Sequence, residues 1–214
     1  MNIGVLALQG SFAEHIKMLN DMGIKTVELR NKNDLQKHPI DGLVLPGGES
    51  TVQGKLLKEL CMMDLLKESI QNGLPVLATC SGLILLAKKI SNGDTPHLAT
   101  MPISIKRNGY GRQISSFHTE ADFKGIGIVP MTFIRAPYVE SISDDVEILA
   151  TVNGLIVAVS YGNQIGLTFH PELNNDYRIY RMFIDMTESR IKKITSYKII
   201  TSSFALKSQP ANSP

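Results

Sequence analysis

Cys80 stands at a position from which a cysteine side chain can act as a nucleophile. The apolar run before it, residues 74–79, predicts a buried strand, and the run after it, residues 83–87, predicts a helix. The small residues Ala78 and Gly82 flank it. A strand that turns directly into a helix over small neighbours exposes its central side chain, and the N–H groups of the helix start favour a thiolate there. We therefore predict an enzyme with a cysteine nucleophile.

His170 and Glu172 supply the two further groups that such a nucleophile needs. A thiol becomes a good nucleophile at neutral pH when a base takes its proton, and that base needs a partner that fixes its tautomer. In an extended segment the side chains of residues i and i+2 point to the same face. A single histidine is more often a structural residue, but the combination with Cys80 predicts a Cys80–His170–Glu172 triad.

The other titratable residues give no sign of a metal or cofactor site. The remaining histidines lack the spacing of metal ligands, so we expect surface or local structural roles for His15, His38, His97 and His118. Cys61 lies in an apolar helical stretch, and we expect it to be buried as a small hydrophobic residue. We therefore predict that the protein uses no metal and no cofactor.

A pair of glycines, Gly47 and Gly48, follows another predicted strand. A phosphate-binding loop would continue with Gly-Lys-Ser or Gly-Lys-Thr, which do not follow here, so nucleotide binding is not expected. The pair is either a simple turn or a place where backbone N–H groups approach a ligand closely. A tetrahedral oxyanion needs two donors, and the N–H groups of Gly48 and Ser81 would provide them.

The elements that must position these residues alternate between strand and helix in the first half of the chain. Expected strands cover residues 3–8, 25–29, 43–45 and 75–79, and expected helices cover residues 11–22, 52–71 and 83–89. Ser11 and Glu14 match a capping box at the start of the first helix. This order predicts an α/β fold with a three-layer, open, mixed but mostly parallel sheet. Ligands bind beyond the carboxyl ends of such strands. Four segments would converge there: residues 9–10, 46–50, 80 and 169–172.

The second half of the chain has shorter alternating runs that predict added antiparallel strands. They cover residues 103–107, 132–136, 146–151 and 155–161, and Gly162-Asn163 between residues 157–161 and 164–169 is a hairpin-turn signal. A final helix is expected over residues 174–190, with Asn174 or Asn175 as its cap. We assign residues 1–191 to one domain. Residues 192–214, rich in Ser, Thr and Lys, are predicted to be a disordered tail or a segment not native to the protein.

The composition excludes several classes of function. The chain has 214 residues, of which 43% are hydrophobic and 20% are charged, as in ordinary globular proteins. Its net charge of +2 comes from the lysines of the C-terminal tail, so nothing indicates a nucleic-acid surface. No apolar run approaches the roughly 20 residues that span a bilayer, and the N-terminus is not typical of a signal peptide. Two cysteines give no disulfide framework, and we predict a cytoplasmic protein.

Six short motifs resemble those of a known family. In chain order they are L-A-L-Q-G (6–10), L-P-G-G-E-S-T (45–51), T-C-S-G-L-I (79–84), R-N-G-Y-G-R-Q (107–113), F-I-R-A-P (133–137) and F-H-P-E-L (169–173). Together they are similar to those of the class I (triad) glutamine amidotransferases. More narrowly, they resemble the PdxT/SNO family of glutaminase subunits of pyridoxal 5′-phosphate synthase. The resemblance covers about residues 1–190 and implies a flavodoxin-like fold.

The resemblance implies a role for each residue of the predicted triad. Cys80 would attack the side-chain amide of L-glutamine, His170 would relay the proton, and Glu172 would orient His170. A thioester intermediate would release ammonia and then be hydrolysed to glutamate.

The same resemblance implies a set of substrate-binding residues. Gly47 and Gly48 match the oxyanion and substrate loop, and Glu49 matches the residue that holds the α-amino group of glutamine. Further glutamine-binding positions are Arg107, Ile134 and Arg135. An amino-acid zwitterion requires an anion and a cation or donor, which these side chains offer. Without the resemblance, the two arginines would be read as solvated surface charges.

A partner is implied as well, because free ammonia is protonated and lost in water. It would be a (β/α)₈-barrel synthase subunit that condenses ribose 5-phosphate and glyceraldehyde 3-phosphate with ammonia, in a hetero-oligomeric complex. We expect the glutaminase to be weak alone and to contact this subunit through residues 9–10 and 46–50. Three sites depart from the family pattern, namely Ala78, Ser81 and Gly109-Tyr110, and none removes a catalytic group.

Two alternatives stay open on the sequence alone. One is a cysteine hydrolase or peptidase of the same architecture, which would not require glutamine as its substrate. The other is a non-catalytic module that keeps the fold in order to bind and regulate a partner. The presence of all three triad residues argues against the second alternative, because a module without catalysis has no need of them.

Overall fold

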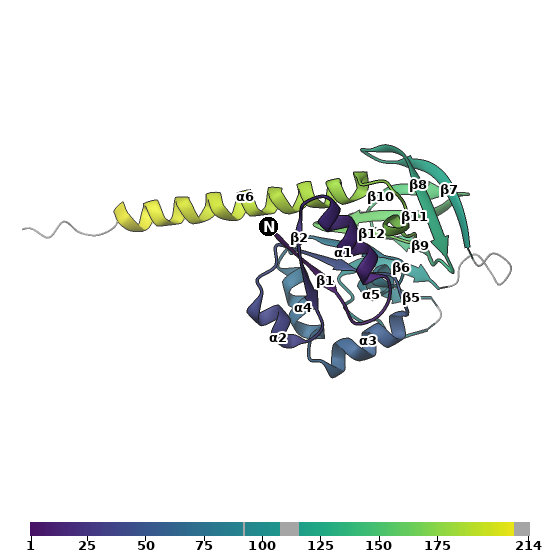
Figure 1. The fold of residues 1–214 in the computed structure, drawn as a ribbon, viewed down its shortest axis with the longest axis horizontal. Helices are drawn as coiled ribbons and strands as arrows, with labels where there is room; N and C mark the ends of the chain where they lie inside the picture. Colours follow the sequence, from purple (N-terminus) through teal and green to yellow (C-terminus); the bar gives the residue numbers. More distant parts are fainter. Residues whose placement is uncertain (92, 108–115, 208–214) are drawn as a thin grey trace, which may run out of the picture.

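A computed structural model describes residues 1–91, 93–107 and 116–207, with the side chains described up to residue 197. Within these residues ten strands form one sheet, in the order β2-β1-β3-β4-β12-β11-β9-β6-β5, and β10 pairs with β11 (Figure 1). A separate hairpin of β7 (Ser116–Phe123) and β8 (Gly127–Ile134) lies beside this sheet. The predicted α/β class is therefore confirmed.

Five neighbouring strands pair in parallel and make the half of the sheet that positions the site. They are β2 (Lys25–Leu29), β1 (Asn2–Leu6), β3 (Gly42–Leu45), β4 (Val76–Thr79) and β12 (Gln164–Leu167). The register pairs Thr79 with Leu167 at the carboxyl ends of β4 and β12. Because the segments that hold Cys80 and His170 follow these two strands, they leave the sheet side by side.

The other half of the sheet is mainly antiparallel. It contains β11 (Leu155–Tyr161), β10 (Glu147–Val152), β9 (Tyr138–Ile142), β6 (Met101–Lys106) and β5 (Ala87–Ile90), of which only β5 and β6 pair in parallel among the described strands. β11 and β12 are consecutive strands that pair in antiparallel fashion, with Tyr161 opposite Gln164. The hairpin turn predicted at Gly162-Asn163 is therefore confirmed.

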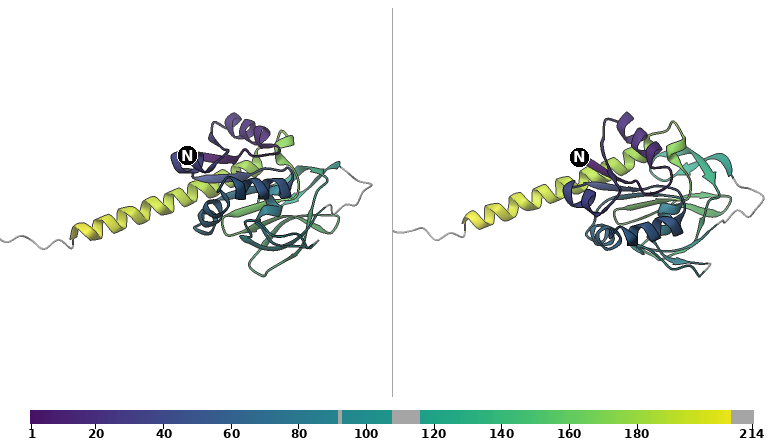
Figure 2. Two further views of the ribbon diagram at one scale, coloured as in Figure 1. Left: turned by 90° about the horizontal axis from the view of Figure 1, so that it is seen from below. Right: turned by 60° about the horizontal axis from the view of Figure 1, so that its bottom comes forward.

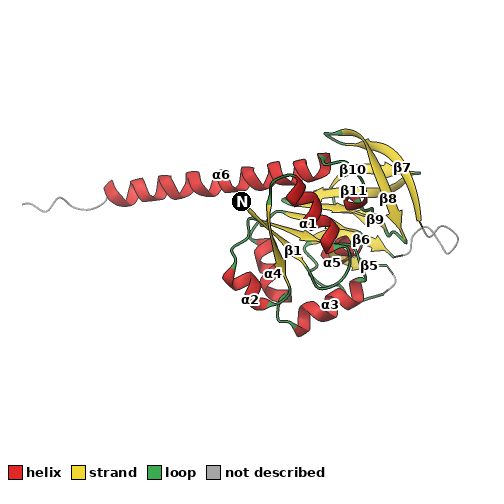
Figure 3. Cartoon of the chain, in the orientation of Figure 1, coloured by secondary structure: helices red, strands yellow, loops and turns green. Residues whose placement is uncertain are grey.

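Helices cover both faces of the sheet, as the three-layer prediction requires (Figures 2 and 3). One hydrophobic core joins the sheet to α3 (Ser50–Glu59), α4 (Met63–Gln71) and α5 (Ser81–Leu86), with α2 (Lys32–Lys37) at its edge. The opposite core joins it to α1 (Phe12–Asp21), α6 (Arg178–Lys207) and the β7–β8 hairpin. Alternation along β3 explains the division, since Leu43 and Leu45 belong to the first core and Val44 to the second.

The helix expected over residues 52–71 is two helices, and the expectation for Cys61 is wrong. Cys61 lies between α3 and α4 with φ at 54°, in the left-handed region that ends a helix. Its side chain is exposed rather than buried. The apolar pattern of the sequence does not show this break, because α3 and α4 both pack their apolar side chains into the same hydrophobic core.

The helix expected over residues 83–89 is also shorter than predicted. α5 ends at Leu86, and β5 begins at once with Ala87. A short apolar run fits a buried helix or a buried strand equally well, so its periodicity does not separate the two.

The last helix begins later and ends later than expected. Asn174 is not its cap, because its side chain bonds Thr132 and the carbonyl of His170. The backbone N–H of Arg178 donates instead to Asp176. α6 runs on to Lys207, past the expected end at 190, and its last part projects from the body of the fold (Figure 1). Residues 208–214 lie outside the described residues, and the domain boundary at 191 stays a prediction. In the described ranges, no helix has both the length and the apolar character to cross a membrane.

Candidate active site

Cys80 occupies a strained turn between β4 and α5. Its backbone has φ 48° and ψ −105°, a conformation that non-glycine residues rarely adopt. The Cys80 N–H donates to the carbonyl of Leu167 at 2.8 Å, which fixes the turn to β12. A Cβ at Gly82 would lie 2.0 Å from the carbonyl oxygen of Leu45, so only glycine lets α5 approach β3 this closely. The geometry is that of a nucleophile elbow.

His170 and Glu172 form a buried hydrogen-bonded pair beyond the end of β12. Nδ1 of His170 lies 2.7 Å from Oε1 of Glu172, and the Glu172 side chain is fully buried. The His170 N–H donates to the carbonyl of Thr132 at 2.8 Å, and Pro171–Leu173 form a single 3₁₀ turn. The i and i+2 side chains thus face each other through a turn rather than along an extended strand.

The His170 imidazole, which lies between the Glu172 carboxylate and Cys80, has a raised pKa and is protonated at neutral pH. Burial lowers the pKa of His170, but hydrogen bonds with Cys80 and Glu172 raise it to about 10. Burial raises the pKa of Glu172, but His15 and the hydrogen bonds from His170 and Ser11 lower it to about 2. A protonated histidine beside a cysteine is the arrangement that activates thiols in cysteine enzymes.

A cavity of about 420 Å³ collects the predicted site residues. Its lining includes Cys80, His170, Gly47, Gly48, Glu49, Ser81, Arg107, Ile134 and Arg135. Glu172 is not part of the lining and lies behind His170. A volume of this size accommodates a small molecule such as an amino acid.

The Gly47–Gly48 loop is fixed by neighbours from two other segments. The Gly47 N–H donates to Oγ1 of Thr79 at 2.9 Å, and the Gly47 carbonyl accepts the Ser11 N–H at 3.0 Å. The N–H of Gly47 is therefore engaged inside the protein. Gly48 and Ser81, the two predicted oxyanion donors, both line the cavity.

A charged group sits at the mouth of the cavity. Nη2 of Arg107 donates to Oε1 of Glu49 at 2.7 Å, and its Nη1 donates to Oδ2 of Asp94 at 2.7 Å. The Glu49 carboxylate also caps α3 by accepting the N–H groups of Thr51 and Val52. Burial raises the pKa of Glu49, but these N–H donors and Arg107 lower it below its ordinary value.

Two other predicted substrate-binding residues lie at the same mouth. Ile134 and Arg135 are exposed at the end of β8, and Arg135 has a positive φ of 43°. Of the motif at 107–113 only Arg107 can be placed, because residues 108–113, with Gly109 and Tyr110, lie outside the described residues.

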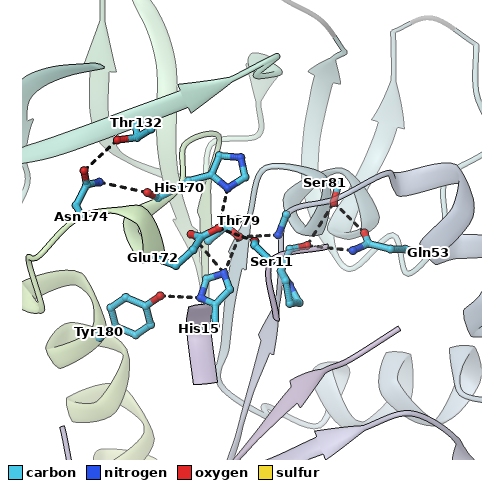
Figure 4. Close-up of polar contacts among 12 residues, drawn as sticks. Ser11, His15, Gln53, Thr79, Ser81, Thr132, His170, Glu172, Asn174 and Tyr180 are labelled. Carbon is cyan, nitrogen blue, oxygen red and sulfur yellow. Dashed lines mark hydrogen bonds and ion pairs between the residues drawn. The ribbon is translucent and has the colours of Figure 1, made fainter. Parts of the chain in front are cut away.

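Several polar residues beside the triad escaped the sequence analysis (Figure 4). The predicted capping box of Ser11 and Glu14 is wrong, since the Ser11 hydroxyl donates to Oε1 of Glu172 at 2.6 Å and does not cap α1. His38 and His118 are exposed as expected, but His15 is fully buried next to Glu172. Only the L-A-L-Q-G string next to Ser11 pointed toward this part of the site.

Gln53 joins the Gly47–Gly48 loop to the start of α5. Its Nε2 donates to the carbonyls of Gln9 at 2.9 Å and of Pro46 at 3.2 Å, and its Oε1 accepts the Ser81 hydroxyl at 2.9 Å. The side chain is fully buried. Ser81, a departure from the family pattern, thus adds a hydrogen bond that holds the loop against the elbow.

Replacing Gln53 with methionine is expected to destabilise the protein and slow its reaction. The change leaves buried carbonyl and hydroxyl groups unpaired, which costs about 1–3 kcal/mol in the free energy of unfolding. A loosened loop is expected to misplace Gly48 and Ser81, the predicted oxyanion donors, and to lower kcat by up to about 100-fold. Urea denaturation and turnover of L-glutamine, the substrate that the resemblance implies, measure the two effects. Gln71→Met, at an exposed position of α4, is the matched control, and equal behaviour of both variants would contradict the prediction.

Comparison with known proteins agrees with the geometry. The model of the SNO glutamine amidotransferase family matches residues 5–189. A relative from Desulfitobacterium hafniense, named pyridoxal 5′-phosphate synthase subunit PdxT, is 60% identical over 86% of this chain and 92% of its own length. A protein of the same name from Haemophilus influenzae is 54% identical over 87% of this chain and 98% of its own. A solved structure described as a glutamine amidotransferase is 38% identical, with a TM-score of 0.82 over 87% of this chain and 98% of that chain.

Proposed function

This chain belongs to the SNO glutamine amidotransferase family, and on that premise we propose that it is the glutaminase subunit of a pyridoxal 5′-phosphate synthase. It hydrolyses L-glutamine to L-glutamate and ammonia and passes the ammonia to the synthase subunit. The observation that carries the proposal is the strained Cys80 elbow, which shares one cavity with a histidine paired to a buried carboxylate. Relatives at 53–60% identity with the PdxT name support it.

The reaction begins at the Cys80 sulfur. It adds as a thiolate, beside the protonated His170, to the side-chain carbonyl carbon of glutamine, and the oxygen becomes an oxyanion held by the N–H groups of Gly48 and Ser81. His170 gives its proton to the departing nitrogen, so that ammonia leaves and a thioester remains. Glu172 keeps the His170 ring oriented throughout.

Water completes the reaction. His170, now neutral, takes a proton from a water molecule whose oxygen attacks the thioester. Collapse of the second tetrahedral intermediate breaks the carbon–sulfur bond and releases glutamate. The cysteine leaves as a thiolate beside the protonated His170, which restores the starting state.

The charged mouth of the cavity binds the amino-acid end of glutamine. Glu49 attracts the α-amino group, and Arg107 and Arg135 provide cations for the α-carboxylate. In the unliganded protein Glu49 and Arg107 neutralise each other at 2.7 Å. A zwitterion replaces this contact with two new ones, which selects for a free amino acid over a peptide.

The partner is a synthase subunit of the (β/α)₈-barrel type, which binds the face that carries residues 9–10 and 46–50. Gln9 and Gly10 line the cavity together with Gly48, so a protein bound there closes it and shields ammonia from water. Contact at this loop also sets the oxyanion donors. We place the complex in the cytoplasm.

A labelling experiment tests the proposed function against its two alternatives. The chain offers an internal control, because Cys61 is exposed while Cys80 is only 7% exposed. A diazoketone analogue of glutamine, applied in the presence of the synthase subunit, is expected to modify Cys80 and leave Cys61 unmodified. Simple iodoacetamide is expected to modify Cys61 first. Mass spectrometry of the two peptides reads out both reactions.

The outcomes separate the three functions. Failure to label Cys80 even with the synthase bound would indicate a non-catalytic module. Labelling together with equal turnover of glutamine, asparagine and short peptides would indicate a general cysteine hydrolase. Only labelling with strict selectivity for glutamine agrees with the proposal.

A further inference from the structure

His15 is a buried titratable residue that the mechanism does not use. It lies on α1, is fully buried, and contacts three polar groups of the site (Figure 4). Its Nδ1 lies 2.7 Å from the hydroxyl of Tyr180. Its Nε2 lies 3.1 Å from Oγ1 of Thr79 and 3.4 Å from Oε2 of Glu172. These contacts join residues 64 and 165 positions apart in the sequence.

The surroundings fix the protonation of the His15 ring. Burial lowers its pKa, and the charge of His170 lowers it further, while Glu172 and Glu14 act in the opposite direction. The imidazole is therefore neutral at physiological pH. Burial and the charge of Glu172 raise the pKa of Tyr180 well above its ordinary value, so its hydroxyl keeps its proton.

The carboxylate beside the ring favours one tautomer. We assign the ring proton to Nε2, so that the Tyr180 hydroxyl donates to Nδ1 across their 2.7 Å contact. Nε2 then lies between Oγ1 of Thr79, its hydrogen-bond partner at 3.1 Å, and Oε2 of Glu172 at 3.4 Å, a buried oxygen with no hydrogen-bond partner among the described residues. The opposite tautomer would turn a lone pair toward the carboxylate and leave the Tyr180 proton without its acceptor.

His15 also connects the carboxylate to the Gly47–Gly48 loop. Thr79, its second neighbour, accepts the Gly47 N–H through Oγ1 at 2.9 Å. Ser11, one turn earlier, bonds Glu172 through its hydroxyl and the Gly47 carbonyl through its N–H. The start of α1 therefore contacts the acid of the triad and the oxyanion loop at the same time.

We propose that His15 is a positioning residue of this active site, which holds the Glu172 carboxylate on His170 and ties it through Thr79 to the Gly47–Gly48 loop. The proposal rests on the proposed function, since it assigns His15 to the same reaction. His15 acts through Glu172 and Thr79 and is not part of the cavity lining. The competing explanation is that His15 only fills the core between α1 and α6.

Two substitutions at His15 separate these explanations. His15→Met removes both ring nitrogens, whereas His15→Gln keeps an N–H donor near the place of Nε2. In complex with the synthase subunit, His15→Met is expected to lower kcat by about 10- to 100-fold with little change in KM, and His15→Gln is expected to recover much of the loss. Met18→Ala, also on α1 and buried, is the control for general destabilisation.

The pH profile is the readout that a core-filling role would not move. The carboxylate raises the pKa of His170, so a displaced Glu172 lowers it. The rate of Cys80 alkylation by chloroacetamide is measured as a function of pH, and its change on the alkaline side (the alkaline limb) reports the loss of the His170 proton. This change is expected at lower pH in His15→Met but not in His15→Gln or Met18→Ala. Unchanged alkaline limbs in all three variants would overturn the proposal. Alkylation of Cys80 does not require glutaminase activity. If the protein without substitutions did not hydrolyse glutamine in complex with the synthase subunit, the proposed function would be contradicted, but the alkylation profiles of the variants could still be compared.

Discussion

Replacing Cys80 with alanine is expected to abolish glutamine hydrolysis while leaving the fold unchanged. Removal of the nucleophile of a catalytic triad costs roughly 10⁶-fold in kcat, because no other group can form the covalent intermediate. Cys80 lines the cavity together with His170, the proposed proton carrier, and no second cysteine lines it among the described residues. Glutamate release in the presence of the synthase subunit measures the loss.

The stability of the Cys80→Ala variant is part of the same prediction. Alanine has the same backbone restrictions as cysteine at φ 48°, and only one sulfur atom is removed. We therefore expect the free energy of unfolding to change by no more than about 1 kcal/mol, as measured by urea denaturation.

Cys61→Ala is the matched control for this experiment. It removes the same atom from an exposed turn with φ at 54° that is not part of the cavity lining. Its activity is expected to equal that of the unmodified protein. A Cys80→Ala variant that releases glutamate within tenfold of the Cys61→Ala rate would show that Cys80 is not the nucleophile.

The residues of the predicted triad could be found from the sequence because their signals are local. Cys80 stands between a strand pattern and a helix pattern, and His170 and Glu172 lie two positions apart. The parallel sheet then brings the ends of β4 and β12 together, as the α/β class requires. Two short motifs and the rule that ligands bind at the carboxyl ends of parallel strands were therefore enough to predict that these residues lie together.

The polar groups behind the triad could not be predicted, because their contacts have no local signature. Ser11 and Glu172 are 161 positions apart, and the four-residue pattern at Ser11 favoured an N-terminal cap. A hydrogen bond to a buried carboxylate is stronger than one to a backbone N–H, so tertiary structure took precedence over the local motif. His15 was missed for the same reason, since a histidine on an apolar helix face has no visible partner in the sequence.

Replacing Gly10 with alanine is expected to damage both the stability and the activity of the protein. Gly10 has φ at 102°, and a Cβ there would lie 1.8 Å from the carbonyl oxygen of Gly47. The colliding atom belongs to the backbone, so the Gly47–Gly48 loop must move away from its contact with Ser11. Strain of this kind costs about 1–3 kcal/mol, and displacement of the proposed oxyanion donors is expected to lower kcat by about 100-fold.

Gly23→Ala isolates the effect of the collision from that of the backbone conformation. Gly23 also has a positive φ, 74°, but a Cβ there meets no atom within 4 Å. This variant is expected to lose stability through backbone strain alone and to keep its kcat at saturating synthase subunit. Urea denaturation and glutamate release are compared for the two variants, with synthase binding measured by titration because Gly10 lies on the proposed docking face. If Gly10→Ala keeps the kcat of Gly23→Ala once synthase is saturating, the close approach of Gly10 to Gly47 does not position the oxyanion loop.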